Sequence, residues 1–205
     1  QVVWLVIALA LYRGQSIPEV TAYLDLVLPD ELNPDIAKST LTQSRQRLGD
    51  EPLAQLFGLS AAAWDDRHQR GQSWRKLARY AVDGSTLRTP DSPENRNLFG
   101  AQAYASGVVA SYPQVRMVTL TALASHLVRE AVFGEYGKNE MRYAKSLLEA
   151  IPDYSLTVFD KGFLSADILL NLQCRGDTRH WLIPAKSNSK WERLDGTSTV
   201  SVRPS

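Results

Sequence analysis

Two aspartates follow short apolar runs in the sequence, and a glycine comes soon after each. Gly84 directly follows Asp83, and Gly162 comes two residues after Asp160. Asp83 ends the run Tyr-Ala-Val, and Asp160 ends the run Thr-Val-Phe. If the runs form neighbouring strands, the two carboxylates meet at the rim of one sheet, where ligands bind in open α/β sheets. Oxygen ligands of this kind suit Mg²⁺ or Mn²⁺. Two such ions can activate a water and stabilise the leaving oxygen of a phosphodiester, so Asp83 and Asp160 are candidate catalytic residues and metal ligands.

An ordinary turn is the alternative explanation for each aspartate. Asp-Gly after a strand is a common turn signal, and either aspartate alone is better explained in that way. Two of them at matched strand ends favour the metal site, which we expect to need a third acid as well. The three histidines, His68, His126 and His180, share no ligand spacing, so the sequence predicts no zinc site.

The elements that would position the two acids lie in the second part of the sequence. There, short runs rich in Val, Leu and Thr predict strands, and two longer segments predict helices. The order is β-β-β-α-β-α-β, which matches a ribonuclease-H-like mixed sheet with flanking helices, of the α+β or α/β class. The predicted strands are residues 79–84, 115–123, 126–136, 155–160 and 180–186, and the predicted helices are residues 140–150 and 165–174.

The first part of the sequence is predicted to be helical. It carries helix caps and tight turns, which are typical of a small helical domain. We predict a DNA-binding domain over residues 1–76 and a catalytic domain over residues 77–205, with a β-rich insertion starting at about 187–205. The predicted helices are residues 2–12, 17–27, 39–48 and 52–69. The first is too short to span a bilayer, so we expect no membrane partner.

Composition narrows the function classes without choosing one. The chain has 205 residues, 44% of them apolar and 22% charged, and a net charge of +1. A net charge this small gives no indication of a nucleic-acid partner. One cysteine, Cys174, excludes a disulfide within the chain and fits a reducing compartment.

Two sequence blocks resemble a known family. "AVDGSTLRTPDSPENRNLFG" resembles the block around the first catalytic aspartate of the DDE transposases of the insertion-element-four group, and "TVFDKGFLS" resembles the block around the second. "STLTQSRQRLG" resembles the N-terminal domain of that group. The resemblance implies cutting and joining of DNA by two metal ions, with Asp83 and Asp160 as the first two acids. It also implies double-stranded DNA partners (element ends and target), a possible homodimer on DNA, and a bacterial, cytoplasmic, nucleoid-associated protein.

The third acid of that group has no counterpart here. It is a glutamate on a later helix, in a tyrosine–arginine–glutamate–lysine signature, and Glu192 lies in a polar segment without helical period. We expect the chain to be a fragment that stops before this acid and is inactive alone. The alternative is a non-catalytic DNA-binding remnant, or a domesticated protein, in which the third acid is lost.

Seven basic residues are candidate DNA contacts. Basic side chains suit phosphate contacts; the alternatives are an amphipathic surface helix, a solvated hinge and plain surface turns. The candidates are Arg45, Arg47, Arg75, Lys76, Arg88, Lys161 and Lys186.

Overall fold

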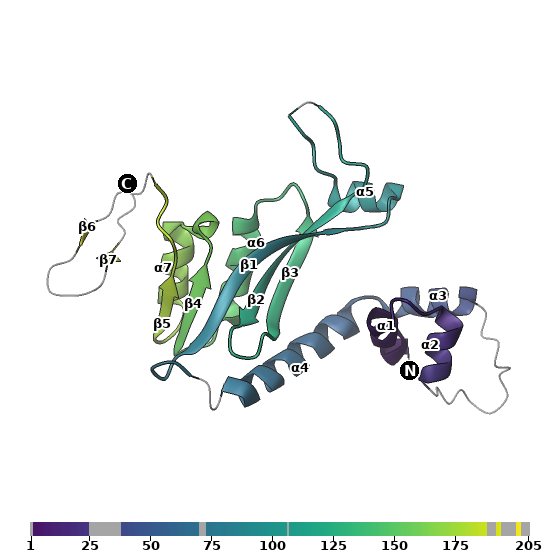
Figure 1. Cartoon of the computed structure of the whole chain (residues 1–205), viewed down its shortest axis with the longest axis horizontal. Coiled ribbons are helices and arrows are strands. Elements are labelled where there is room, and N and C mark those ends of the chain that lie inside the picture. The colour runs from purple at the N-terminus through teal and green to yellow at the C-terminus, as the bar shows by residue number, and fades with distance from the viewer. Residues whose placement is uncertain are drawn as a thin grey trace. The chain divides into compact units, whose positions relative to one another are not determined.

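A computed structural model describes residues 2–24, 38–69, 73–105, 107–187, 192–193 and 200–201 of the chain. The chain divides into two compact units, Gln1–Ser60 and Ala61–Ser205. The division falls inside helix α4 (Glu51–Gln69), which belongs to both units. The functional domains predicted at residues 1–76 and 77–205 remain a prediction. Figure 1 shows the elements of each unit.

The first unit is a small cluster of helices, as predicted. Its core consists of Leu5, Ala8, Val20 and Leu41, which are almost fully buried. The helices besides α4 are α1 (Val2–Leu11), α2 (Ile17–Tyr23) and α3 (Lys38–Leu48). The predicted end of the second helix, at residues 25–27, lies outside the described residues.

The second unit contains a mixed five-stranded sheet in the order β3-β2-β1-β4-β5. The first three strands pair antiparallel, while β4 lies parallel to β1 and β5 parallel to β4. The ribonuclease-H-like fold, with the first and fourth strands as neighbours, is thus confirmed. The strands are β1 (Ala78–Arg88), β2 (Gln114–Ala122), β3 (Val128–Glu135), β4 (Ser155–Phe159) and β5 (Arg179–Leu182).

Two helices, α6 (Glu140–Leu147) and α7 (Ala166–Cys174), cover one face of this sheet (Figure 1). Alternate residues of the central strands point into the resulting core, among them Tyr80, Val82 and Phe159, each at most 2% exposed. Short 3₁₀ turns follow α6 and β4, at η1 (Leu148–Ala150) and η2 (Lys161–Phe163).

Two predicted strand ends were wrong, and one helix was not predicted. The first strand does not end at Gly84: β1 continues to Arg88, because residues 85–88 also pair with β2 although three of the four are polar. The segment after it holds helix α5 (Pro93–Phe99), whose N-cap Ser92 accepts a hydrogen bond from the Asn95 amide. The fifth strand is shorter than predicted and ends at Leu182.

The predicted β-rich insertion lies largely outside the described residues. Its described parts are two short paired strands, β6 (Glu192–Arg193) and β7 (Val200–Ser201).

Candidate metal centre

The register between β1 and β4 brings the two candidate acids side by side. The last parallel pair joins Val82 to Phe159, and the next residues are Asp83, within β1, and Asp160, directly after β4. Since neighbouring strands lie about 4.8 Å apart, the two backbones are adjacent at this point. Val82 points into the helix-covered core, so Asp83, the next residue of β1, points to the face of the sheet away from α6 and α7. Asp160 directly follows β4 and is the N-cap of η2.

Each carboxylate is exposed and is oriented by a nearby backbone amide. Asp83 accepts a hydrogen bond from the Gly84 amide at 2.8 Å. Asp160 caps η2 and accepts from the Gly162 amide at 2.9 Å. Both bonds use Oδ1 of the aspartate. Neither acid forms an ion pair with a residue that the structure describes.

The donor set fits a hard divalent cation. Two exposed carboxylates, one on β1 and one directly after β4, form no ion pair among the described residues and supply the oxygen ligands that Mg²⁺ and Mn²⁺ prefer. Within the described ranges, no group of three His, Cys, Asp or Glu residues converges on one point. Among the described residues, the candidate site therefore offers two carboxylates, those of Asp83 and Asp160.

Two of the predicted DNA contacts lie at the same end of the sheet as the acids. Lys161 directly follows Asp160 and is exposed. Lys186 is also exposed, and its ammonium group donates to the Leu164 carbonyl, just after η2, at 3.3 Å. Their positions are compatible with contacts to a phosphate held near the two aspartates.

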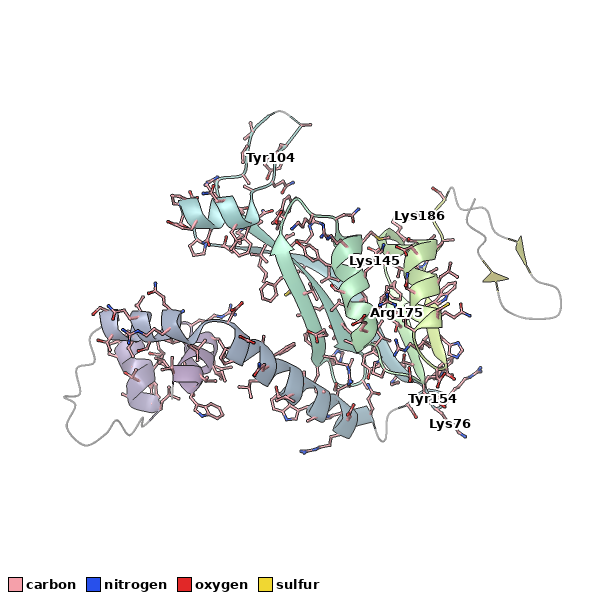
Figure 2. The ribbon with its side chains drawn as sticks, turned by 180° about the vertical axis from the view of Figure 1, so that it is seen from behind. Lys76, Tyr104, Lys145, Tyr154, Arg175 and Lys186 are labelled. Carbon is pink, nitrogen blue, oxygen red and sulfur yellow. The ribbon has the colours of Figure 1, made fainter. Side chains whose placement is uncertain are left out.

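The other predicted contacts lie elsewhere. Arg88 is at the far end of β1, where its guanidinium stacks over the Tyr112 ring at 4.3 Å. Arg75 and Lys76 form an exposed turn before β1, at the end of the sheet opposite Lys186, as the labels in Figure 2 show for Lys76. Both turn residues have positive φ, 51° and 67°.

Arg45 and Arg47 lie in the last turn of α3 and are exposed. They belong to the first unit, so the second unit's acids and these arginines are separate features of the chain.

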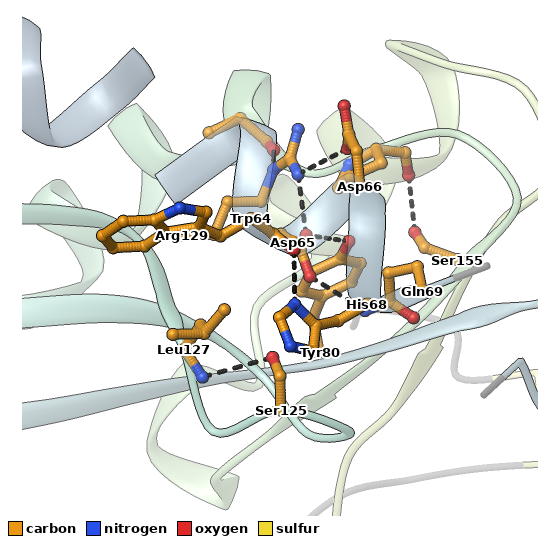
Figure 3. A network of polar contacts seen from close by, with 12 residues as sticks. Trp64, Asp65, Asp66, His68, Gln69, Tyr80, Ser125, Leu127, Arg129 and Ser155 are labelled. Atoms are coloured by element: carbon orange, nitrogen blue, oxygen red, sulfur yellow. Dashed lines mark hydrogen bonds and ion pairs between the residues drawn. The ribbon is translucent and has the colours of Figure 1, made fainter. Parts of the chain in front are cut away.

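Sequence reasoning missed a second, buried polar cluster, drawn in Figure 3. Asp65 of α4 is fully buried. It accepts from the Tyr80 hydroxyl at 2.5 Å, from Arg129 at 2.7 Å and from the Gln69 amide at 3.0 Å. Arg129 also reaches Asp66 at 3.2 Å. Burial, followed by the hydrogen bond to Asp65, raises the pKa of Tyr80 well above its usual range. The signal was the Asp-Asp pair in an otherwise basic segment, but its partner Arg129 is distant in sequence.

None of the helices in the described part of the chain is long and apolar enough to cross a membrane.

Comparison with known proteins gave two family matches. Residues 1–58 match the family described as "Insertion element 4 transposase N-terminal", and residues 74–204 match the family described as "Transposase DDE domain".

Two Escherichia coli (strain K12) proteins are similar in sequence. The chain is 37% identical to "Transposase InsG for insertion sequence element IS4" over 94% of its own length and 43% of that protein. It is 36% identical to "Putative transposase InsZ" over 98% of its length and 66% of that protein. The chain thus spans between about two fifths and two thirds of these relatives. A piggyBac transposase synaptic complex with hairpin DNA gives a TM-score of 0.37 at 13% identity, over 55% of this chain and 24% of the other.

Proposed function

We propose that this chain, which belongs to the DDE transposase family, carries the first two acids of a site that cuts and joins DNA. The observation that carries the proposal is the β1–β4 register, whose last pair joins Val82 to Phe159, the residues directly before Asp83 and Asp160. Two exposed carboxylates that follow directly on this last pair suit the metal-dependent phosphodiester chemistry of this family.

Asp83 and Asp160 would hold divalent metal, which we propose to be two ions of Mg²⁺ or Mn²⁺. When bound, such ions supply charge that lowers the pKa of a coordinated water and stabilises the leaving oxygen of a phosphodiester. The protein's own part is to fix the two carboxylates. The Gly84 and Gly162 amides do this by occupying one oxygen of each aspartate.

The partner would be double-stranded DNA, at element ends and at the target, in the cytoplasm of a bacterium. Lys161 and Lys186 would contact the phosphates nearest the acids, and Arg88 those further along β1. Arg45 and Arg47 would bind DNA through the helical unit, and Arg75 and Lys76 through their exposed turn. A homodimer on DNA is part of the same proposal.

The remnant hypothesis receives less support. Both sequence relatives are described as transposases, and both acids of the matched blocks are present. We propose that the third acid comes from outside the residues that the structure describes.

The test of the catalytic site is an assay of Mn²⁺-dependent nicking of duplex DNA with insertion-element ends, by the transposase that carries this chain. Asp83→Asn and Asp160→Asn should each abolish nicking and leave DNA binding intact, because the amide removes a charged metal ligand. Glu135→Gln is the matched control, since Glu135 is an exposed acid at the end of β3 and forms an ion pair with Lys138. Nicking at the wild-type rate by either aspartate variant would rule out the assignment.

The test of the helical unit is the salt dependence of duplex DNA binding by this chain. Arg45→Ala combined with Arg47→Ala should reduce the slope of log K against log salt by about 2, that is, by about 1 for each arginine that no longer neutralises a phosphate. An unchanged slope would exclude both arginines as phosphate contacts.

A further inference from the structure

Strand β1 loses a neighbour at the position of the candidate metal ligand. Up to Val82 it pairs with β2 on one side and with β4 on the other. From Asp83 to Arg88 the described pairing is with β2 alone. The backbone that carries Asp83 is therefore no longer hydrogen-bonded into the sheet on both sides, and other contacts have to fix its position.

Glu140, the first residue of α6, supplies such a contact. Its carboxyl group lies directly against Gly84, so a Cβ at residue 84 would meet the carboxyl carbon at 2.9 Å and the two oxygens at 3.0 and 3.1 Å. These distances are shorter than ordinary contacts with a Cβ, so only glycine lets the carboxyl group approach the strand this closely. Successive residues of a strand face opposite sides of the sheet, so the side-chain position of residue 84 faces α6 while the Asp83 side chain faces away from it.

Arg116 of β2 holds this carboxyl group in place. Its guanidinium donates to Glu140 at 2.6 Å and to the Tyr136 carbonyl at 2.9 Å, and it stacks over the Tyr136 ring at 4.8 Å. The Arg116 side chain is 19% exposed, so solvent screens the pair only in part. In register Arg116 lies opposite Thr86 of β1, and the ion pair thus ties α6 to the sheet beside the length of β1 that pairs with β2 alone.

We propose that Arg116 and Glu140 are positioning residues for Asp83: they hold the β1 backbone from behind, so that the carboxylate keeps its place beside Asp160. The inference rests on the proposed function, because it assigns a role toward the same metal site. Groups that hold a metal ligand without touching the metal commonly affect metal affinity about 10- to 100-fold.

The test is a Mn²⁺ titration of the 205-residue chain. Binding is monitored in NMR spectra as the paramagnetic loss of the Gly162 backbone amide signal. We expect Glu140→Ala and Gly84→Ala each to raise the Mn²⁺ concentration needed for half loss by about 10-fold. Glu140→Gln should stay near the wild type, because its amide oxygen can still accept from Arg116 and its shape is unchanged. Glu135→Gln is again the surface control.

The double variant Gly84→Ala/Glu140→Ala sharpens the test. The nearest atoms to a Cβ at residue 84 all belong to Glu140, so removal of the carboxyl group makes room for the methyl. The added methyl should therefore weaken Mn²⁺ binding much less in the Glu140→Ala background than in the wild type. If Gly84→Ala weakens Mn²⁺ binding as much in the Glu140→Ala background as in the wild type, the contact between residues 84 and 140 is not the cause of the weakening.

Asp83→Asn separates this inference from the function on which it rests. If Asp83→Asn leaves the Mn²⁺ response unchanged, or if the wild type gives none, the metal site itself is wrong and the positioning role falls with it. If Asp83→Asn removes the response while Glu140→Ala and Gly84→Ala keep it at the wild-type level, the metal site stands and only the positioning role is overturned.

Discussion

Asp65 and Asp83 are both aspartates connected with strand β1, but one is buried and the other is exposed to solvent. Asp65 is fully buried and accepts hydrogen bonds from Tyr80, Arg129 and Gln69. Asp83, on the strand itself, is exposed, and its described hydrogen bond is to the next backbone amide. One carboxylate is saturated by protein partners, and the other keeps an oxygen available.

The difference separates a structural acid from a candidate ligand by physical criteria. A buried charge needs partners to offset its loss of water, and Asp65 accepts hydrogen bonds from three residues. An exposed acid at the rim of a sheet loses little hydration and can exchange water for a metal ion. Substitutions should therefore affect folding stability at Asp65 and metal binding at Asp83.

The largest expected loss of stability is at Asp65. Asp65→Ala should lower the free energy of unfolding by about 3–5 kcal/mol, because Arg129 and Tyr80 lose their buried partner. Urea denaturation of the chain measures this. Asp66→Ala is the control: Asp66 is 67% exposed, and we expect a change within about 0.5 kcal/mol. Similar losses of unfolding free energy for both variants would show that the buried cluster does not stabilise the fold more than a surface acid does.

A smaller loss is expected when only one hydrogen bond to Asp65 is removed. Tyr80→Phe keeps the ring in the core and deletes the hydroxyl that donates to the carboxylate at 2.5 Å. Hydrogen bonds to charged groups contribute about 1.5–3 kcal/mol, so the urea-derived free energy of unfolding should fall by roughly that amount. A variant as stable as the wild type would mean that the bond adds nothing to folding.

The pH dependence of the same pair sharpens the result. Burial, with the hydrogen bond to Asp65, raises the pKa of Tyr80 in the folded protein, so the folded state favours the protonated phenol. The contribution of this bond is complete below the unfolded value of about 10 and is lost as the pH rises through the folded value. The stability difference between wild type and Tyr80→Phe should thus be constant near neutral pH and should shrink above about pH 10. A difference that grows above that pH would contradict the assignment.

The smallest effect on stability is expected at the candidate ligands. Asp83→Asn and Asp160→Asn should change the free energy of unfolding by no more than about 0.5 kcal/mol, because both side chains are exposed and form no ion pair in the described structure. Thermal or urea unfolding checks this on the same chain. A loss as large as that at Asp65 would make Asp83 a structural residue.

The sequence was sufficient to predict the mixed sheet, and it predicted that the two acids come close together if the first and fourth strands are neighbours, which they are. The first part of β1 and the whole of β4 are short, mainly apolar runs followed by an aspartate, and such local patterns reveal the element. The continuation of β1 to Arg88 was not predictable in this way. Apart from Leu87, its residues after Asp83 are glycine or polar, so they look like a turn, whereas pairing with β2 makes them a strand.

Long-range contacts explain what else was missed. Asp65 and Arg129 lie 64 positions apart in sequence, and no periodic pattern connects a helix end with the third strand. The approach of Glu140 to Gly84 is likewise a property of the packing of α6 on the sheet. The sequence predicted neither, because both depend on which residues the finished fold brings together.

The central claim is that Asp83 and Asp160 share a metal site, and the most direct measurement is anomalous X-ray scattering from crystals of this chain soaked in Mn²⁺. We predict a manganese peak about 2.1 Å, a usual metal–oxygen distance, from a carboxylate oxygen of both aspartates. Carboxylates that point apart, or manganese bound only elsewhere, would contradict the claim and leave the two residues as ordinary turn aspartates.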